Sequence, residues 1–267
     1  SKCTLIIRRE KDGIRRYVHV ATGNYNASTA KLYTDLGIFT CSDTFGADAS
    51  AFFNLLSGYS DPPVWDSFLV APINLRERCV ALIDREIRHV KNGENGHIIA
   101  KMNSLLDSRM VDKLYEASQA GVKIELIVRG ICVLIPGIPG VSDNITVRSL
   151  VGRFLEHSRV FWFNNGGREE LYIGSADWMP RNLNDRVELM IPVKDIDCMH
   201  RIKNMVLKEL ADNQKAHIMQ SNGTWVKMIA SENKVCAQEY FQKLAEQRSE
   251  QEKMTLKQKF EPYVPVK

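Results

Sequence analysis

The sequence feature that most constrains the fold is a near-continuous apolar segment, VKIELIV, at residues 122–128. A strand with one face in water alternates apolar and polar residues, whereas a strand buried on both faces is apolar throughout, as in a parallel sheet covered by helices. Residues 108–121, directly before it, are predicted to form a helix. Strands and helices alternate along the rest of the chain as well, which predicts an α/β architecture.

The other expected elements follow the same reading of hydrophobic periodicity and turn residues. Helices are predicted at 26–35, 42–58, 72–93, 195–211 and 232–255, and strands at 3–9, 15–22, 36–40, 97–102, 145–149, 159–163, 171–174 and 186–192. Ser42 or Asp43 is the expected cap of one helix, and Pro72 is expected in the first turn of the next. Residues 129–144 form a long loop, which predicts a functional or domain-contact segment.

Composition narrows the class of protein without naming a function. Hydrophobic residues make up 44% of the chain and charged residues 25%, as in a globular protein with a real core. No apolar run approaches the ~18 residues of a membrane span. The net charge of +4 is too small to argue for a nucleic-acid partner. No two cysteines have C-x-x-C spacing, which argues against a zinc site and favours a reduced, cytoplasmic setting.

Two regions of the chain repeat the same order of elements, which indicates an internal duplication. The matching positions are Ser1 with Ser158, Thr22-Gly23 with Gly174-Ser175, and Asp35 with Glu188. In the second region His157 and Arg159 are two residues apart, so a strand would place imidazole and cation on one face. The repeat predicts a partner His one residue before Ser1, and two such half-sites facing each other would form an active site. Asp35 and Glu188 are candidates to orient the catalytic groups.

The repeated pattern, H-x-K or H-x-R with a hairpin and a G-S-x-N-like turn, resembles the phospholipase D superfamily. Longer strings resemble the C-terminal half of polyphosphate kinase of the first type, over nearly all of residues 1–235: YVHVATGNYN, AKLYTDLGIFT, VDKLYEASQAGVKIELIVRGIC and RFLEHSRVFWF. The resemblance implies two phospholipase D-like α/β domains with mixed sheets flanked by helices. Residues 1–67 would be the later part of an incomplete first domain, 68–252 the second domain, and 253–267 a charged tail.

The resemblance also implies a reaction. In that family a His takes the γ-phosphate of ATP and passes it, as phosphohistidine, to the end of inorganic polyphosphate, reversibly. That His would precede Ser1, so this chain alone is expected to lack kinase activity. The family's second His matches His157, with Lys2 and Arg159 as its catalytic cations. Tyr33 matches a nucleotide-contacting residue, and Arg129 and His157 match phosphate-binding residues.

The resemblance further implies Mg²⁺ in the intact enzyme, with ligands upstream, so no metal ligand is assigned in this chain. ATP, ADP and polyphosphate are the expected partners, with a homo-oligomer as the expected assembly. One alternative is a phospholipase D-type phosphodiesterase or nuclease, although H-S-R departs from H-x-K. Another is a non-catalytic polyanion-binding module.

Other residues carry weaker hypotheses. His89-Val90-Lys91 also spells H-x-K but is expected to be a solvated helix end. His19 is expected to be structural. Arg8-Arg9 and Arg15-Arg16 either line a polyphosphate groove or form the solvated face of a hairpin. Without the resemblance, Tyr33 would be a packing aromatic at the end of a helix.

Overall fold

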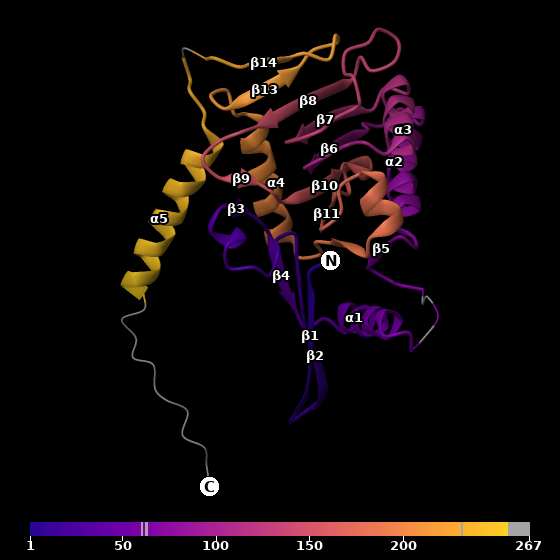
Figure 1. Cartoon of the computed structure of the whole chain (residues 1–267), viewed down its shortest axis with the longest axis vertical. Coiled ribbons are helices and arrows are strands. Elements are labelled where there is room, and N and C mark those ends of the chain that lie inside the picture. The colour runs from indigo at the N-terminus through magenta and orange to yellow at the C-terminus, as the bar shows by residue number, and fades with distance from the viewer. Residues whose placement is uncertain (60, 62–63, 231, 256–267) are drawn as a thin grey trace.

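The computed structural model of the protein describes residues 1–59, 61, 64–230 and 232–255. Its large sheet contains β5 (Leu69–Ala71), β6 (His97–Met102), β7 (Lys123–Val128), β8 (Ile145–Leu150), β10 (Arg159–Phe163), β11 (Glu170–Gly174), β12 (Glu188–Pro192), β13 (Ala216–Met219) and β14 (Trp225–Lys227). The spatial order is β14-β13-β8-β7-β6-β10-β11-β12-β5 (Figure 1). A second sheet has the order β1-β2-β4, formed by β1 (Cys3–Glu10), β2 (Gly13–Ala21) and β4 (Gly37–Thr40).

The apolar segment that predicted a buried parallel strand is β7, and the prediction is confirmed. β7 pairs in parallel with both β6 and β8, whereas the other pairs of the large sheet are antiparallel. Ile124, Leu126 and Val128 of β7 are completely buried. The sheet is therefore mixed. Its parallel part is β6-β7-β8, and parallel strands of this kind are joined by helices that cover the sheet.

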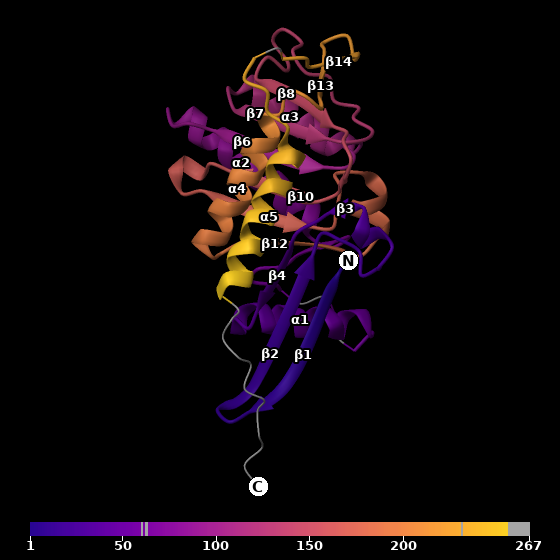
Figure 2. The ribbon, with the colours of Figure 1, turned by 90° about the vertical axis from the view of Figure 1, so that its left-hand side faces the viewer.

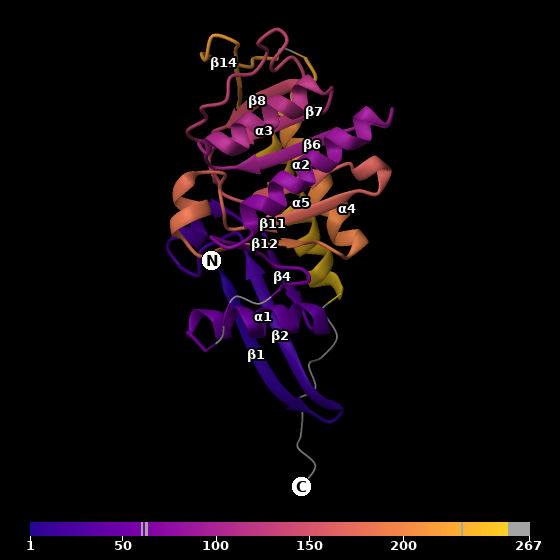
Figure 3. The same cartoon turned by 90° about the vertical axis from the view of Figure 1, so that its right-hand side faces the viewer.

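Five α-helices are described: α1 (Asp43–Leu56), α2 (Leu75–Lys91), α3 (Ser108–Gln119), α4 (Ile196–Leu210) and α5 (Ala237–Thr255). α2 and α3 cover one face of the large sheet (Figure 3), and α4 and α5 lie on the opposite side (Figure 2). Leu75, Cys79 and Ile83 form the buried stripe of α2. The predicted α/β fold, with mixed sheet flanked by helices, is what the structure shows.

The helix predicted at residues 26–35 is wrong. The segment contains a single 3₁₀ turn, Thr29–Lys31, followed by the short strand β3 (Tyr33–Thr34). The side chain of Asn26 accepts hydrogen bonds from the backbone N–H groups of Ser28 (3.0 Å) and Thr29 (3.1 Å), which offers the backbone a turn instead of a helix. Tyr33 consequently lies on a strand and not at the end of a helix.

The ends of other elements also differ from the prediction. Pro72 follows a cis peptide bond and precedes α2, whose N-cap is Asn74. Ser42 is the N-cap of α1 but makes no side-chain capping hydrogen bond. The last helix begins at Ala237 instead of residue 232. The strands β5, β13 and β14 were not predicted, because three or four residues are too few to show a period.

The division into residues 1–67, 68–252 and 253–267 stays a prediction. Of the predicted tail, residues 253–255 lie within α5, and residues 256–267 lie outside the described residues. Within the part of the chain that is described, no helix combines the length and the hydropathy that a membrane crossing requires.

Candidate active site

The two halves of the chain meet at a short parallel pair of strands, β3 and β9 (Leu155–Glu156). Tyr33 pairs with Leu155 and Thr34 with Glu156. His157 follows directly, and its backbone N–H donates to the carbonyl oxygen of Thr34 (3.2 Å). This junction places the H-S-R motif of the second half against the L-Y-T-D segment of the first.

The imidazole of His157 is held from both sides. Nδ1 lies 2.9 Å and 3.1 Å from the two carboxylate oxygens of Asp35, and Nε2 lies 2.9 Å from Nη1 of Arg159. A guanidinium can only donate, so Nε2 must be the acceptor. Nδ1 therefore carries the proton and donates it to Asp35. Asp35 and Arg159 thus fix one tautomer of the largely buried His157 ring, and its Nε2 lone pair is directed at Arg159.

Arg159 is in turn fixed by Asp177. Nε of Arg159 donates to Oδ1 (3.1 Å) and Nη2 to Oδ2 (3.3 Å), a two-pronged pair that leaves Nη1 for His157. Nη1 also donates to the backbone oxygen of His157 (2.8 Å). The pair is buried, so removing Asp177 would leave an uncompensated charge.

Arg129 reaches the same place from the carboxyl end of β7. Its Nε donates to Oδ1 of Asn103 (2.8 Å), the residue that follows β6. Asn103 donates from its backbone N–H to Oδ1 of Asp177 (2.7 Å) and from Nδ2 to the oxygen of His157 (3.4 Å). The carboxyl ends of adjacent parallel strands thus deliver Asn103 and Arg129 to one edge, which is where open α/β sheets bind ligands.

Tyr33 lies beside the imidazole of His157, and Lys2 lies near enough to Arg159 and Asp35 for their charges to act on it. Burial lowers the pKa of Lys2, and the attraction of Glu188 opposes that shift, while Arg159 adds to it. The ring of Tyr33 lies 4.7 Å, between centroids, from the ring of His157. Among the described residues, neither Lys2 nor Arg129 has a carboxylate oxygen within 4.0 Å. Two cations that are not neutralised by direct ion pairs therefore accompany the His157 site, as the binding of a polyanion requires.

The predicted duplication is visible as two equivalent carboxylate clasps. In the first half Thr22 Oγ1 donates to Asp35 (2.7 Å), and in the second Ser175 Oγ donates to Glu188. The backbone N–H of Thr22 bonds to Leu36, and that of Ser175 bonds to Leu189 in the same way (2.9 Å and 2.8 Å).

The carboxylate of the first clasp points across the molecule, because Asp35 of the first half contacts His157 of the second. The small residue and the acid of one half therefore hold the imidazole of the other. The sequence predicts both acids as candidates to orient catalytic groups, and Asp35 does contact His157.

The remaining candidate residues lie elsewhere. His89 is not a solvated helix end, because Nδ1 contacts Glu94 and Nε2 lies 3.2 Å from Oδ1 of Asn165. Arg8 and Arg15 pair with Glu10 and Asp12 near the tip of the β1–β2 hairpin. This tip lies far from β3 and β9 in Figure 1.

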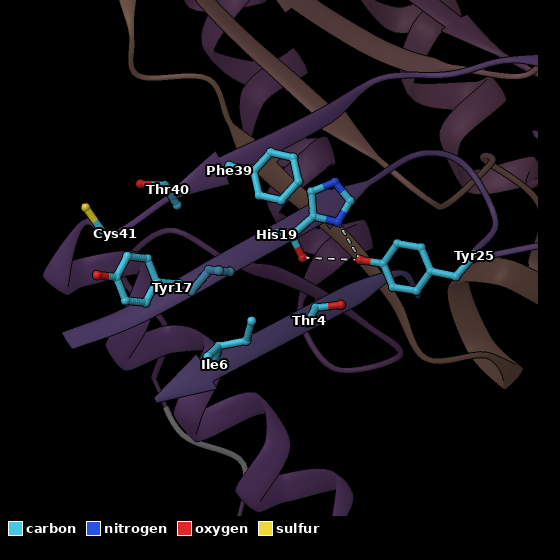
Figure 4. Close-up of a pocket in the computed structure, with 9 residues that line it drawn as sticks. Thr4, Ile6, Tyr17, His19, Tyr25, Phe39, Thr40 and Cys41 are labelled. Carbon is cyan, nitrogen blue, oxygen red and sulfur yellow. Dashed lines mark hydrogen bonds between the residues drawn. The ribbon is translucent and has the colours of Figure 1, made fainter. Parts of the chain in front are cut away.

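His19 lies on the outer face of the β1-β2-β4 sheet, stacked between Phe39 and Tyr25 (Figure 4). Together with Thr4 and Ile6 they line a hollow of about 410 Å³. None of the residues that line this hollow belongs to the group around His157. The stacking of His19 on Phe39 and Tyr25 fits the prediction that His19 has a structural role.

Sequence reasoning missed Asn103 and Asp177. Both carried a signal: Asn103 is the first residue after a parallel strand, and Asp177 ends G-S-A-D, the counterpart of Asn24 in the first repeat. It also missed the buried cluster Lys101, Glu156 and Glu209 behind His157, which contributes two ion pairs. Nothing in the spacing of these three residues announces that they meet.

Comparison with known proteins shows the family to which this chain belongs. The family model described as polyphosphate kinase C-terminal domain 2 matches residues 68–238, and that described as C-terminal domain 1 matches residues 1–62. A polyphosphate kinase of Synechocystis sp. is 55% identical over 226 residues, and one of Halalkalibacterium halodurans is 50% identical over 254 residues. These alignments cover 85% and 94% of this chain but 31% and 36% of the relatives, so the chain spans about a third of their length.

A solved structure gives the same result. The crystal structure of polyphosphate kinase from Porphyromonas gingivalis superposes with a TM-score of 0.87 at 39% identity, covering 94% of this chain and 39% of that one. A phosphatidylserine synthase of Haemophilus influenzae superposes with a TM-score of 0.51 at 10% identity, which is a likeness of fold alone.

Proposed function

Because this chain belongs to the polyphosphate kinase family, we propose that it supplies part of the active site of an enzyme that moves phosphoryl groups between ATP and inorganic polyphosphate. The observation that carries the proposal is that Asp35 of the first half and Arg159 of the second both contact His157, while Arg129 is joined to it through Asn103. Phosphoryl transfer requires chiefly this: in-line positioning, and cations against the phosphoryl oxygens.

In the proposed reaction a His nitrogen forms a bond to the γ-phosphorus of ATP while the bond to the bridging oxygen breaks, and ADP leaves with the electron pair. The terminal oxygen of a polyphosphate chain then attacks that phosphorus and the nitrogen–phosphorus bond breaks. By the resemblance the His that carries the phosphoryl group has no match among these 267 residues. His157 is the second His of the pair, and the clasp at Glu188 is the counterpart of its own clasp at Asp35.

Each residue has a separate part in this proposal. His157 accepts a proton at Nε2, the atom whose lone pair faces Arg159 in this structure. Arg159, locked by Asp177, supports His157 through Nη1 and places a positive charge beside it for the phosphoryl oxygens. Arg129 and Lys2 neutralise the phosphates, and Tyr33 contacts the nucleotide beside His157.

We also propose Mg²⁺ as a cofactor of the whole enzyme. Within the described residues no group of three or more His, Cys, Asp or Glu side chains is placed to hold a metal ion, so no step is assigned to the metal here. ATP, ADP and polyphosphate as partners, a homo-oligomer and a cytoplasmic setting belong to the same proposal. The six free cysteines agree with the last of these.

The test uses a protein of the relatives' full length that contains these residues. With γ-³²P-labelled ATP it should acquire acid-labile, base-stable label and produce polyphosphate. The variant His157→Ala should lose polyphosphate synthesis, whereas the control His200→Ala, on an exposed position of α4, should keep it. Full synthesis by the His157→Ala variant would contradict the proposal.

A further inference from the structure

The C-terminal helix α5 is attached to the protein through its first turn. The backbone N–H of Ala237 donates to Oδ2 of the buried Asp212 (2.8 Å), and Ala237 itself is buried. One turn later Lys208 of α4 lies over the ring of Tyr240, 4.5 Å from its centroid. Most of the helix beyond is exposed, and it runs along the side of the molecule in Figures 1 and 2. The contacts between α5 and the rest of the protein therefore lie mainly in its first turn.

Gln238, in this first turn, is bonded to the segment that leads into His157. Its Oε1 accepts from the backbone N–H of Phe154 (3.1 Å), and its Nε2 donates to the carbonyl oxygen of the same residue (2.9 Å). Nε2 also donates to Oε1 of Glu156 (2.7 Å). The side-chain amide of Gln238 thus pairs with the backbone of Phe154 as a neighbouring strand would. It also binds the side chain of Glu156, two residues further on.

Glu156 connects Gln238 to the first half of the chain. Its other oxygen, Oε2, accepts from Nζ of the buried Lys101 (2.8 Å) and from Oγ1 of Thr34 (2.8 Å). Burial alone would raise the pKa of Glu156, but Lys101, with the Gln238 and Thr34 donors, outweighs it and holds that pKa at about 2. A permanently charged carboxylate therefore joins β6, β3 and α5 at the residue immediately before His157.

The backbone of His157 itself is also bonded to Thr34, Arg159 and Asn103, whereas the strand before it is short. β9 has two residues, held to β3 by backbone bonds such as Leu155 N–H to Leu32 (2.9 Å). A two-residue pairing is weak by itself, so the position of the strand depends on side chains that bracket it. The approach of α5 also needs Gly152, because a Cβ there would come within 2.4 Å of Oε1 of Gln238.

We propose that Gln238 is a positioning residue for His157: from α5 it holds Phe154 and Glu156, sets β9 against β3, and thereby keeps the imidazole between Asp35 and Arg159. Its importance for catalysis rests on the proposed function, but its effect on the imidazole does not. The positional precision matters because a displacement of about 1 Å in a catalytic group can cost on the order of 10²-fold in rate.

The first test measures the imidazole directly, in this 267-residue chain labelled with ¹⁵N-histidine. Long-range ¹H–¹⁵N spectra at pH 8.5 report which ring nitrogen of His157 carries the proton, and His157→Gln identifies its signals. We expect a single Nδ1–H tautomer in the unaltered chain. In Gln238→Ala the two nitrogen shifts should move toward each other as the tautomers mix, whereas Gln242→Ala, which pairs only within α5 with Glu246 among the contacts described, should leave them unchanged.

A second route reaches the same residue without altering it. Gly152→Ala should displace the Gln238 side chain and move the nitrogen shifts of His157 in the same direction as Gln238→Ala. Circular dichroism checks that the variant is folded, so that a loss of positioning can be told from a general loss of fold. In a full-length protein Gln238→Ala should lower kcat roughly tenfold to a hundredfold with a smaller change in KM. Unchanged His157 shifts in folded Gln238→Ala protein would overturn the proposal, whatever the outcome of the phosphotransfer assay.

Discussion

The carboxyl group of Glu209 should make the stability of this protein fall as pH rises from acid to neutral. Glu209 lies on α4, 2% exposed, and accepts a hydrogen bond from Lys101 at Oε1, while no partner is described for Oε2. Burial raises the pKa of Glu209 to about 8, with the neighbouring charge of Glu156 adding to the shift against the attraction of Lys101. Lys101 and Glu156 already balance each other, so a proton on Glu209 keeps the cluster neutral.

The size and sign of the effect follow from proton linkage. The ordinary pKa of 4.5 applies to Glu209 in the unfolded chain, and a pKa of about 8 applies in the folded protein. Between these two pH values the folded protein keeps a proton that the unfolded chain has lost. The stabilisation is complete below pH 4.5 and is lost progressively as pH rises through 8. One proton corresponds to at most about a tenfold change in the unfolding constant per pH unit, or on the order of 5 kcal/mol across the window.

Urea unfolding of the chain at pH 5, 6, 7 and 8 measures this dependence. The variant Glu209→Gln keeps an acceptor for Lys101 but has no proton to lose, so its stability should change less across the same range. The control Glu116→Gln, an exposed partner of Lys113, should keep the slope of the unaltered chain. Equal slopes in the unaltered chain and in Glu209→Gln would refute the reasoning.

Two further outcomes follow from the site. Asp35→Asn should release the imidazole of His157 from its single tautomer and lower phosphotransfer by up to about 10⁴-fold, as loss of a His-orienting carboxylate does in other sites; ¹⁵N-histidine spectra and the γ-³²P assay check this, and unchanged spectra would count against it. Gly174→Ala should destabilise the chain by about 1–3 kcal/mol in urea unfolding, because its Cβ would come within 2.6 Å of the carbonyl oxygen of Leu189; an unchanged midpoint would show that β11 and β12 can separate without cost.

Local sequence determined more of the fold than of the site. The apolar run at β7, the helices α2, α3 and α4, and the hairpin β1–β2 were predicted because each depends on a period or turn within a dozen residues. The same locality explains the error at residues 26–35, where the Asn26 turn and the pairing of β3 with β9 override helix propensity. The repeat of small residues and acids was also visible, although the sequence aligned Thr22 with Gly174, whereas the structure makes Ser175 its counterpart.

Which side chains meet at the site was decided only by the tertiary structure. The sequence singled out His157, Arg159 and Asp35. It did not show that Asp35 contacts His157 across 122 positions, or that Asp177 fixes Arg159. Lys101, Glu156, Glu209 and Gln238 gave no sign in their spacing, since each belongs to a different strand or helix. The physical reason is the same in every case: periodicity records which face of an element is buried, whereas the partner of a buried charge is fixed by how distant elements pack against one another.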